Sequence, residues 1–271
     1  MTDMQENSCT EFYADYVVSA ADMSATERAT WLYKTRVGNR KDASTLGWLN
    51  ELLRTGMARL GHIANDMYCD LLDGRMSHEG WSLFLREYYW GSGYGFQRVV
   101  LPAAAKGSSN DIWRTYIKSI IYEENMPSSH CDMFKTFMQS IGVEVGDLPG
   151  SAAAFNQKML SGYSGSLGHS MGYALGIETE ADFQIALLFV SLRAEYEEQV
   201  EHTEFFRIHM SESGEELHAQ ETCASIEQLL DQGLCTEAEI KQGFRQAIVD
   251  TRDYMLAIRA SVRASNVAAI A

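Results

Sequence analysis

The sequence of 271 residues has few prolines, an excess of acidic over basic residues and no long apolar run. Only three prolines occur, at positions 102, 127 and 149, and this scarcity favours long helices because proline interrupts them. The formal net charge of −15 argues against nucleic-acid binding through a basic face. No apolar stretch is long enough to cross a membrane, and residues 1–8 lack the basic and apolar regions of a signal peptide. We therefore predict no nucleic-acid partner, no membrane association and a cytoplasmic location.

Cysteine is scarce and scattered. The five cysteines are odd in number and form no C-x-x-C pair; they are Cys9, Cys69, Cys131, Cys223 and Cys235. A disulfide framework or a zinc ribbon is therefore disfavoured, and a reducing compartment fits.

Apolar residues make up 46% of the chain, enough for the core of one sizeable domain. Apolar residues recur at spacings of three and four through most of the sequence, which predicts an all-α fold of seven to nine helices. One long helix is expected from about residue 44 to 73, and an acidic amphipathic stretch covers 194–230, with Gly214 as a break. We divide the chain into an N-terminal extension (1–43), a helical domain (44–264) and a C-terminal tail (265–271).

The most informative stretch runs from residue 120 to 143. It places two adjacent carboxylates, Glu123 and Glu124, shortly before His130, with apolar residues on both sides. Pro127 ends or kinks the helix between them, so the acids and the histidine are expected on successive segments around a shared cavity. The alternative is surface acids at a helix end and a histidine that caps carbonyls.

A second carboxylate, Glu178, interrupts the apolar segment that runs from about residue 173 to 193. A carboxylate that faces a core needs a partner, either a metal ion or an arginine. Arginines 86, 98 and 193 are the candidates for the second case. Glu180 and Asp182 are interpreted as solvated neighbours.

A third group follows in residues 201–221. His202, His209 and Glu216 are spaced by seven and would form one stripe on a straight helix. Glu215 and His218 form an i, i+3 pair of the kind that binds metals in helical bundles. Unwinding at Gly214 would let both His209 and His218 face inward; otherwise His202 and His218 are ordinary surface residues.

The three groups together offer carboxylates and histidines from three helices, without a thiolate. Such a donor set suits iron or manganese, and a dimetal site of Glu and His in a bundle core is a known solution. His62, the one candidate for a heme ligand in the early helices, is interpreted as a residue at the core boundary.

Four segments carry a family resemblance. They are L-L-D-G-R-M-S-H-E-G-W-S-L-F-L-R-E-Y-Y-W (71–90), Y-E-E-N-M-P-S-S-H-C-D-M-F-K-T-F-M-Q-S-I-G-V (122–143), G-Y-A-L-G-I-E (172–178) and F-F-R-I-H-M-S-E-S-G-E-E-L-H-A (205–219). Together they resemble the heme-oxygenase-like diiron oxidase and oxygenase superfamily. The resemblance covers about residues 60–222 and implies the seven-helix fold of heme oxygenases, TenA thiaminases and PqqC, with extra terminal helices.

The family's ligands are a glutamate and a histidine in an acidic motif, a central glutamate, and a final H-x3-D-x2-H. The resemblance assigns these to Glu123 or Glu124, His130, Glu178 and His209. The final motif departs from the family: without gaps its last two ligands become Ser213 and Glu216, and with a two-residue insertion they become Glu215 and His218. Both alignments stay open, and the departure puts the second metal in doubt.

The function that the resemblance implies is an O2-dependent nonheme diiron oxidase or oxygenase in specialised-metabolite biosynthesis. Two irons (or manganese), a small amino-acid-derived or fatty-acid-like substrate, O2 and an external electron donor are expected, with N-oxygenation, desaturation or oxidative C–C cleavage as the outcome and a homodimer as the assembly. Arg86, Tyr89 and Arg98 are the candidates for substrate contacts. A cofactor-free PqqC-like oxidase or TenA-like hydrolase and a non-catalytic helical binding protein are the alternatives.

Overall fold

The computed structural model describes the backbone of residues 2–210 and 214–268, and the side chains of residues 9–210 and 218–265. Every regular element in these ranges is a helix, which confirms the predicted all-α bundle. In chain order they are α1 (Thr2–Ala20), α2 (Ala25–Tyr33), η1 (Lys34–Gly38), α3 (Gly47–Arg59), α4 (Asp66–Leu72), α5 (His78–Tyr88), η2 (Tyr89–Gly93), η3 (Gly95–Val100), α6 (Leu101–Gly107), α7 (Asp111–Glu123), α8 (His130–Ser140), α9 (Gly150–Gly162), α10 (Leu167–Glu195), α11 (Glu197–Glu201), α12 (Glu204–His209), α13 (Gly214–Asp231) and α14 (Glu237–Ala268), where η marks a π-helix.

The centre of the bundle is the pair α10 and α14, which share the most extensive helix contact in the chain. Their backbones approach closely because both contribute glycine at the crossing. A Cβ atom added at Gly172 would lie 2.0 Å from the carbonyl oxygen of Ile240, and one at Gly243 would lie 2.0 Å from that of His169. The glycines of α10 and α14 thus permit a tight helix crossing.

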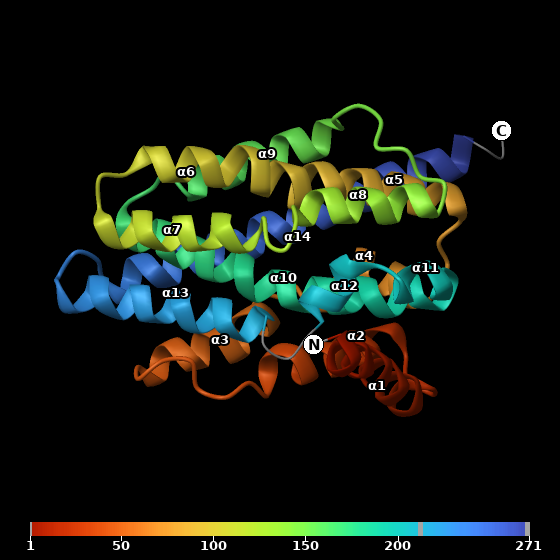
Figure 1. The fold of residues 1–271 in the computed structure, drawn as a ribbon, viewed down its shortest axis with the longest axis horizontal. Coiled ribbons are helices and arrows are strands. Elements are labelled where there is room, and N and C mark those ends of the chain that lie inside the picture. The colour runs from red at the N-terminus through yellow and green to blue at the C-terminus, as the bar shows by residue number, and fades with distance from the viewer. Residues whose placement is uncertain (1, 211–213, 269–271) are drawn as a thin grey trace.

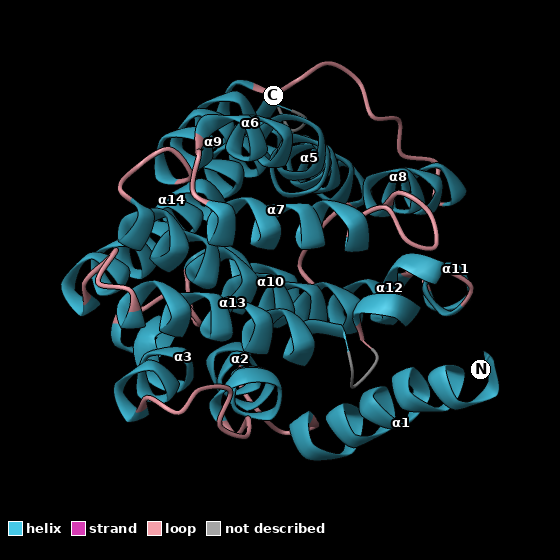
Figure 2. Ribbon diagram, turned by 60° about the vertical axis from the view of Figure 1, so that its left-hand side comes forward, coloured by secondary structure: helices cyan, strands magenta, loops and turns pink. Residues whose placement is uncertain are grey.

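The other helices surround α10 on all sides. Figure 1 and Figure 2 show α5, α6 and α9 on one side of α10, and α2 and α3 on the opposite side. α13 packs along α10 and also contacts α7, while α4 and α12 cover other parts of α10. Because it is enclosed in this way, α10 buries nearly every side chain along its length. Within the described residues, no helix is both long and apolar enough to cross a membrane.

The predicted long helix from residue 44 to 73 is wrong, because the chain breaks between α3 and α4. Gly61 adopts a positive φ of 66°, and Asn65 caps α4 by accepting hydrogen bonds from the backbone N–H groups of Met67 and Tyr68. The apolar spacing continues through this break, which is why periodicity alone missed it. The break carries His62 into the core, where its side chain is fully buried, so the interpretation of His62 as a boundary residue is also wrong.

The acidic stretch from 194 to 230 is also divided. α11 ends at Glu201, α12 ends at His209, and α13 begins at Gly214. His202, His209 and Glu216 therefore do not form one stripe of a straight helix, and His202 is an exposed residue that follows α11. These breaks leave the described residues with more helical segments than the seven to nine predicted.

Candidate functional site

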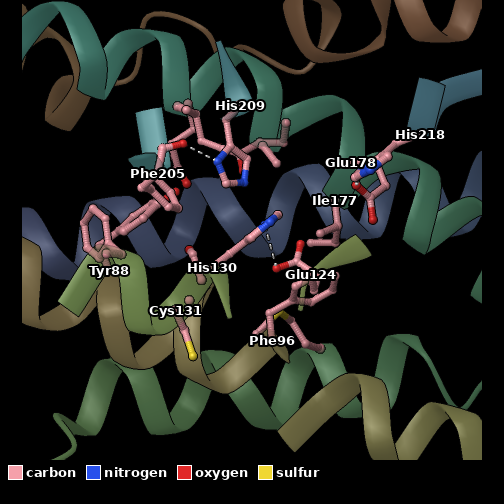
Figure 3. A pocket seen from close by; sticks show the side chains of 18 of the residues that line it. Tyr88, Phe96, Glu124, His130, Cys131, Ile177, Glu178, Phe205, His209 and His218 are labelled. Carbon is pink, nitrogen blue, oxygen red and sulfur yellow. Dashed lines mark hydrogen bonds and ion pairs between the residues drawn. The ribbon is translucent and has the colours of Figure 1, made fainter. Parts of the chain in front are cut away.

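A cavity lies at the middle of α10, enclosed by α8, α12, α13 and the segment from α5 to η3 (Figure 3). About 70 Å³ of it is open to the centres of water-sized molecules. Six carboxylate and imidazole side chains line it: Glu124, His130, Glu178, Glu180, His209 and His218. Aromatic side chains complete the wall: Tyr88, Phe96, Phe134, Phe155 and Phe205.

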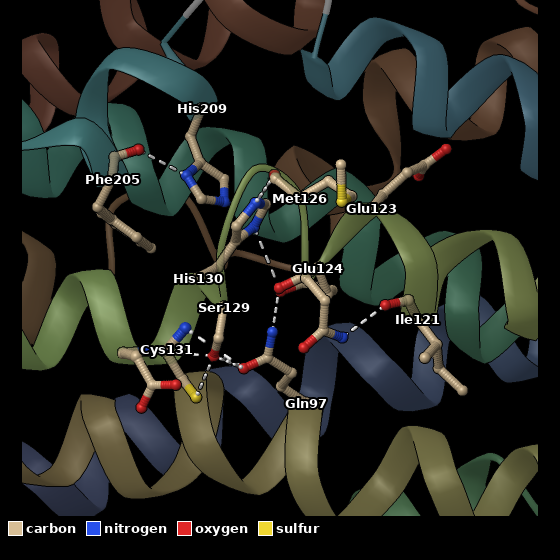
Figure 4. Close-up of polar contacts among 12 residues, drawn as sticks. Gln97, Ile121, Glu123, Glu124, Met126, Ser129, His130, Cys131, Phe205 and His209 are labelled. Atoms are coloured by element: carbon tan, nitrogen blue, oxygen red, sulfur yellow. Dashed lines mark hydrogen bonds and ion pairs between the residues drawn. The ribbon is translucent and has the colours of Figure 1, made fainter.

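The turn between α7 and α8 positions the first two of these side chains. Glu124 follows the last residue of α7, and His130 is the first residue of α8. Pro127 lacks an N–H group and ends the first helix, while Ser129 caps the second by accepting from the N–H of Asp132. Gln97 donates from its side-chain amide to the carbonyl oxygen of Glu124 (Figure 4). The predicted arrangement of successive segments around a cavity is therefore present.

Glu124 and His130 form a buried ion pair, with Oε2 of Glu124 3.4 Å from Nδ1 of His130. On its other side, the His130 ring hydrogen-bonds through Nε2 to the carbonyl oxygen of Met126 at 3.0 Å. Burial opposes ionisation of Glu124, but the hydrogen bond and charge of His130 outweigh it and lower the pKa of Glu124. Glu124 is therefore a carboxylate inside the cavity at neutral pH.

His209 lies against His130, with their ring centroids 4.7 Å apart (Figure 4). Burial, together with the neighbouring His130, lowers the pKa of His209 to about 4, so its imidazole is neutral at pH 7. Nδ1 donates to the carbonyl oxygen of Phe205 over 2.7 Å. The proton on Nδ1 leaves the Nε2 lone pair to act as an acceptor or a metal ligand.

A second group joins Glu123, Glu178 and His218. Oε2 of Glu123 lies 2.8 Å from Nε2 of His218, and Oε2 of Glu178 lies 3.4 Å from Nδ1 of the same ring. Only 7% of Glu178 is exposed, and its Oε1 has no hydrogen-bond partner among the described side chains. A buried carboxylate oxygen in this state is poised to accept a proton donor or a cation.

Six of the residues considered from the sequence therefore form two groups, and five of them line the cavity, while Glu123 contacts His218 beside it. The first group is Glu124, His130 and His209, and the second is Glu123, Glu178 and His218. None of the three arginines considered as partners of Glu178 pairs with it in the structure: Arg86, Arg98 and Arg193 bind other groups. The side chains of Glu215 and Glu216 lie outside the described residues.

The donor types suit iron or manganese, since neutral imidazole and carboxylate both ligate these metals. Three of the six side chains, Glu178, His130 and His209, are buried, which suits a metal site as well. The imidazoles and carboxylates hydrogen-bond or pair with one another, and among the described residues no three donors surround a common point. The residues thus fit a metal site in their chemistry and location. In this structure, the side chains that would bind the metal pair with one another.

Glu180 and Asp182 are not solvated neighbours, and the sequence interpretation of both is wrong. Glu180 is 4% exposed and Asp182 1% exposed. Glu180 lines the cavity and is held by Tyr68 and His62, while Asp182 pairs with Arg36 and Arg40. One signal in the sequence could have identified them: both lie in a helical run that is apolar on every face, which leaves no side for solvent.

The expected substrate contacts Arg86, Tyr89 and Arg98 do not line the cavity. Arg86 donates to the carbonyl oxygen of Glu144. Arg98 reaches Ser129 and Asp132 outside the cavity. Tyr89 packs against other aromatic rings, whereas its neighbour Tyr88, which the helix turns inward, lines the cavity.

The sequence matches no protein-family model and no curated protein. The fold is similar to that of a solved CADD-like protein of unknown function from Nostoc punctiforme PCC 73102. The TM-score is 0.63, the sequence identity 15%, and the similarity covers 79% of this chain and 98% of the other. At this identity the similarity shows a shared all-α fold.

Proposed function

We propose that the protein is a nonheme dimetal enzyme that uses O2 to oxidise a small molecule, with iron as the metal and manganese as its substitute. One observation carries the proposal: three histidines and two carboxylates from α8, α10, α12, α13 and the turn after α7 line one cavity, and a third carboxylate, Glu123 at the end of α7, contacts one of these histidines. Their chemistry matches the donor set that the resemblance to heme-oxygenase-like diiron enzymes implies. The shared fold of the CADD-like protein is consistent with it.

The two groups of side chains divide naturally between two metal ions. Glu124, His130 and His209 would hold one ion, and Glu123, Glu178 and His218 the other. Both Glu123 and Glu124 would then be metal ligands, whereas the resemblance assigned this role to one or the other. The place of His218 in the cavity supports the alignment with a two-residue insertion, in which Glu215 and His218 complete the final motif.

Bound iron would supply the capacity to bind and activate O2. The chain's own residues position the ligands and form the pocket. The turn held by Gln97 and Ser129 sets the separation of Glu124 from His130. The bond from His209 to Phe205 fixes its tautomer, so that Nε2 is available as a ligand. The aromatic wall excludes bulk water, and the small volume limits the substrate to a compact molecule.

The experiment measures iron per chain in protein from which metal has been removed and to which Fe(II) has been added without oxygen. His130→Ala and His218→Ala, one from each group, are compared with the wild type and with His202→Ala, an exposed histidine outside both groups. Circular dichroism verifies that each variant is folded. We expect two tightly bound irons in the wild type and His202→Ala, and about one in each of the other two.

The same samples are then mixed with O2 and followed by visible absorbance. A transient band in the wild type that both cavity variants lose supports an O2-activating centre. A wild type that binds no iron or manganese at any loading would refute the dimetal proposal, and equal iron loss in His202→Ala would refute the assignment of ligands.

A further inference from the structure

One carboxylate that lines the cavity, Glu180, is not among the proposed metal ligands. Glu178 and Glu180 are two residues apart on α10, so their side chains leave the helix about 160° apart. Between them, the face toward the cavity carries Ile177, Ala181 and Ile185. Glu178 reaches His218 on α13, whereas Glu180 turns toward α4. The two carboxylates therefore stand at opposite borders of one cavity wall.

A network of buried donors holds Glu180. The Tyr68 hydroxyl donates to Oε1 of Glu180 over 2.5 Å, and Nε2 of His62 lies 3.1 Å from the same oxygen. The Gln184 amide donates in turn to the Tyr68 hydroxyl over 2.8 Å. Tyr68 and His62 are fully buried and Gln184 is 1% exposed, so no bulk water competes for these bonds.

The direction of these bonds fixes the position of the carboxyl group. Gln184 occupies the acceptor side of the Tyr68 hydroxyl, so the hydroxyl proton points to Glu180. Oε1 accepts from this hydroxyl, and Nε2 of His62 lies close to both Oε1 and the hydroxyl oxygen, at 3.1 and 3.3 Å. These bonds hold the Glu180 side chain in one orientation at the cavity wall.

Apart from the buried imidazole of His62, 3.1 Å away, no basic side chain among the described residues pairs with Glu180. Among the described residues that line the cavity there is no lysine and no arginine. A buried carboxylate is costly without a counter-charge, and the aromatic side chains Tyr88, Phe96, Phe134 and Phe155 provide a surface that favours an organic cation. No lysine or arginine among the described lining residues could pair with a substrate carboxylate.

We propose that Glu180 binds the ammonium group of a small aliphatic amine, whose alkyl chain lies against the aromatic wall. This assignment rests on the proposed function, because it names the substrate class of the same cavity. It replaces the fatty-acid-like and arginine-bound substrates expected from the sequence with a cationic one. Tyr68, His62 and Gln184 act as positioning residues for Glu180.

The test measures binding by calorimetry, without oxygen, to the iron-loaded protein and to the metal-free protein. The probes are n-butylammonium, 1-butanol and butyrate, which share an alkyl chain and differ in charge. Glu180→Gln keeps the shape and removes the charge. Glu87→Gln is the matched control, because Glu87 is also a buried glutamate, 5% exposed, but lies outside the cavity.

We expect n-butylammonium to bind the wild type and Glu87→Gln at least tenfold more tightly than the alcohol or the acid. Glu180→Gln should lose at least tenfold in amine affinity and keep the wild-type iron content. Equal binding of amine and alcohol, or unchanged amine binding in Glu180→Gln, would overturn the proposal. Loss of iron from folded Glu180→Gln would overturn it too, because Glu180 would then be a metal ligand.

The two proposals fail separately. A wild type that takes up no metal but prefers the amine through Glu180 would refute the dimetal function and support the amine site. A wild type that binds two irons but shows no preference for the amine would leave the dimetal function standing and refute the amine site.

Discussion

Replacing Asp182 by asparagine tests how the segment after α2 is fastened to the core. Asp182 is 1% exposed and accepts from two arginines: Nε and Nη2 of Arg36 lie 2.9 and 2.6 Å from Oδ1, and Nη2 of Arg40 contacts Oδ2. Arg36 also donates to the carbonyl oxygen of His209 at 3.3 Å. The carboxylate therefore links η1 and the loop after it to α10 and α12.

The expected cost follows from the charge left behind. Asp182→Asn keeps the volume but leaves two guanidinium groups, each 13% exposed, without their counter-charge. Removing one partner of a buried ion pair typically costs about 3–5 kcal/mol. We expect about 3 kcal/mol, since asparagine still offers one acceptor and the arginines can turn partly to water. At about 2–4 °C per kcal/mol, the Tm should fall by roughly 6–12 °C.

Thermal and urea unfolding followed by circular dichroism measure this loss. Asp42→Asn is the control: it makes the same change of charge at an exposed ion pair with Arg54, where Asp42 is 64% exposed. Such a pair contributes about 0–1 kcal/mol. If the two variants unfold at the same temperature and urea concentration, the buried ion pairs of Asp182 stabilise the fold no more than the exposed pair does, and the argument from burial is wrong.

Two further predictions concern the helix crossing and the cavity histidine. Gly172→Ala should lose about 3 kcal/mol of unfolding free energy, because its Cβ would lie 2.0 Å from a backbone oxygen, whereas Gly47→Ala, with no atom within 4 Å of its Cβ, should lose nothing in the same urea titration. For His209 the folded pKa of about 4 lies below the ordinary 6.5, so the unfolded state binds the extra proton within this window and the unfolding free energy falls as the pH drops from 6.5 to 4. Urea titrations of the metal-free protein at pH 7, 5.5 and 4 should show the wild type losing about 3 kcal/mol more than His209→Gln, and parallel pH profiles would contradict a buried neutral His209.

Local chemistry made part of the fold predictable from the sequence. Ser77, Asn110 and Ser129 each cap a helix as their side chains suggest, by accepting from an N–H of the first turn. Pro127 separates the two helices that carry the acids and His130. These features depend on neighbours within a few residues, so the sequence contains all that decides them.

Breaks in helices depend on tertiary packing, and the sequence did not reveal them. The apolar spacing through Leu60 and Ile63 fits a continuous helix, yet the chain turns there and buries His62. The seven-residue spacing of His202 and His209 likewise assumed a straight helix. Both His209 and His218 line the cavity because the helix breaks redirect the short segments that carry them.

Buried charges were the hardest features to predict, because their partners are distant in sequence. Glu180 is 112 residues from Tyr68, and Asp182 is 146 residues from Arg36. Acidic residues at spacings of two look like a solvated face when each is considered alone. Because the surrounding segment has no polar side, both residues could have been predicted to be buried.

α10 carries three buried carboxylates within five residues, and the structure compensates each one differently. Glu178 contacts His218, Glu180 contacts Tyr68 and His62 and lines the cavity, and Asp182 pairs with two arginines. Only for Asp182 do fully charged side chains of the protein balance the anion. A buried anion is costly unless a donor or a cation compensates it. We therefore propose a metal ion as the partner of Glu178 and an organic ammonium as the partner of Glu180, whereas Asp182 pairs with the protein's own arginines.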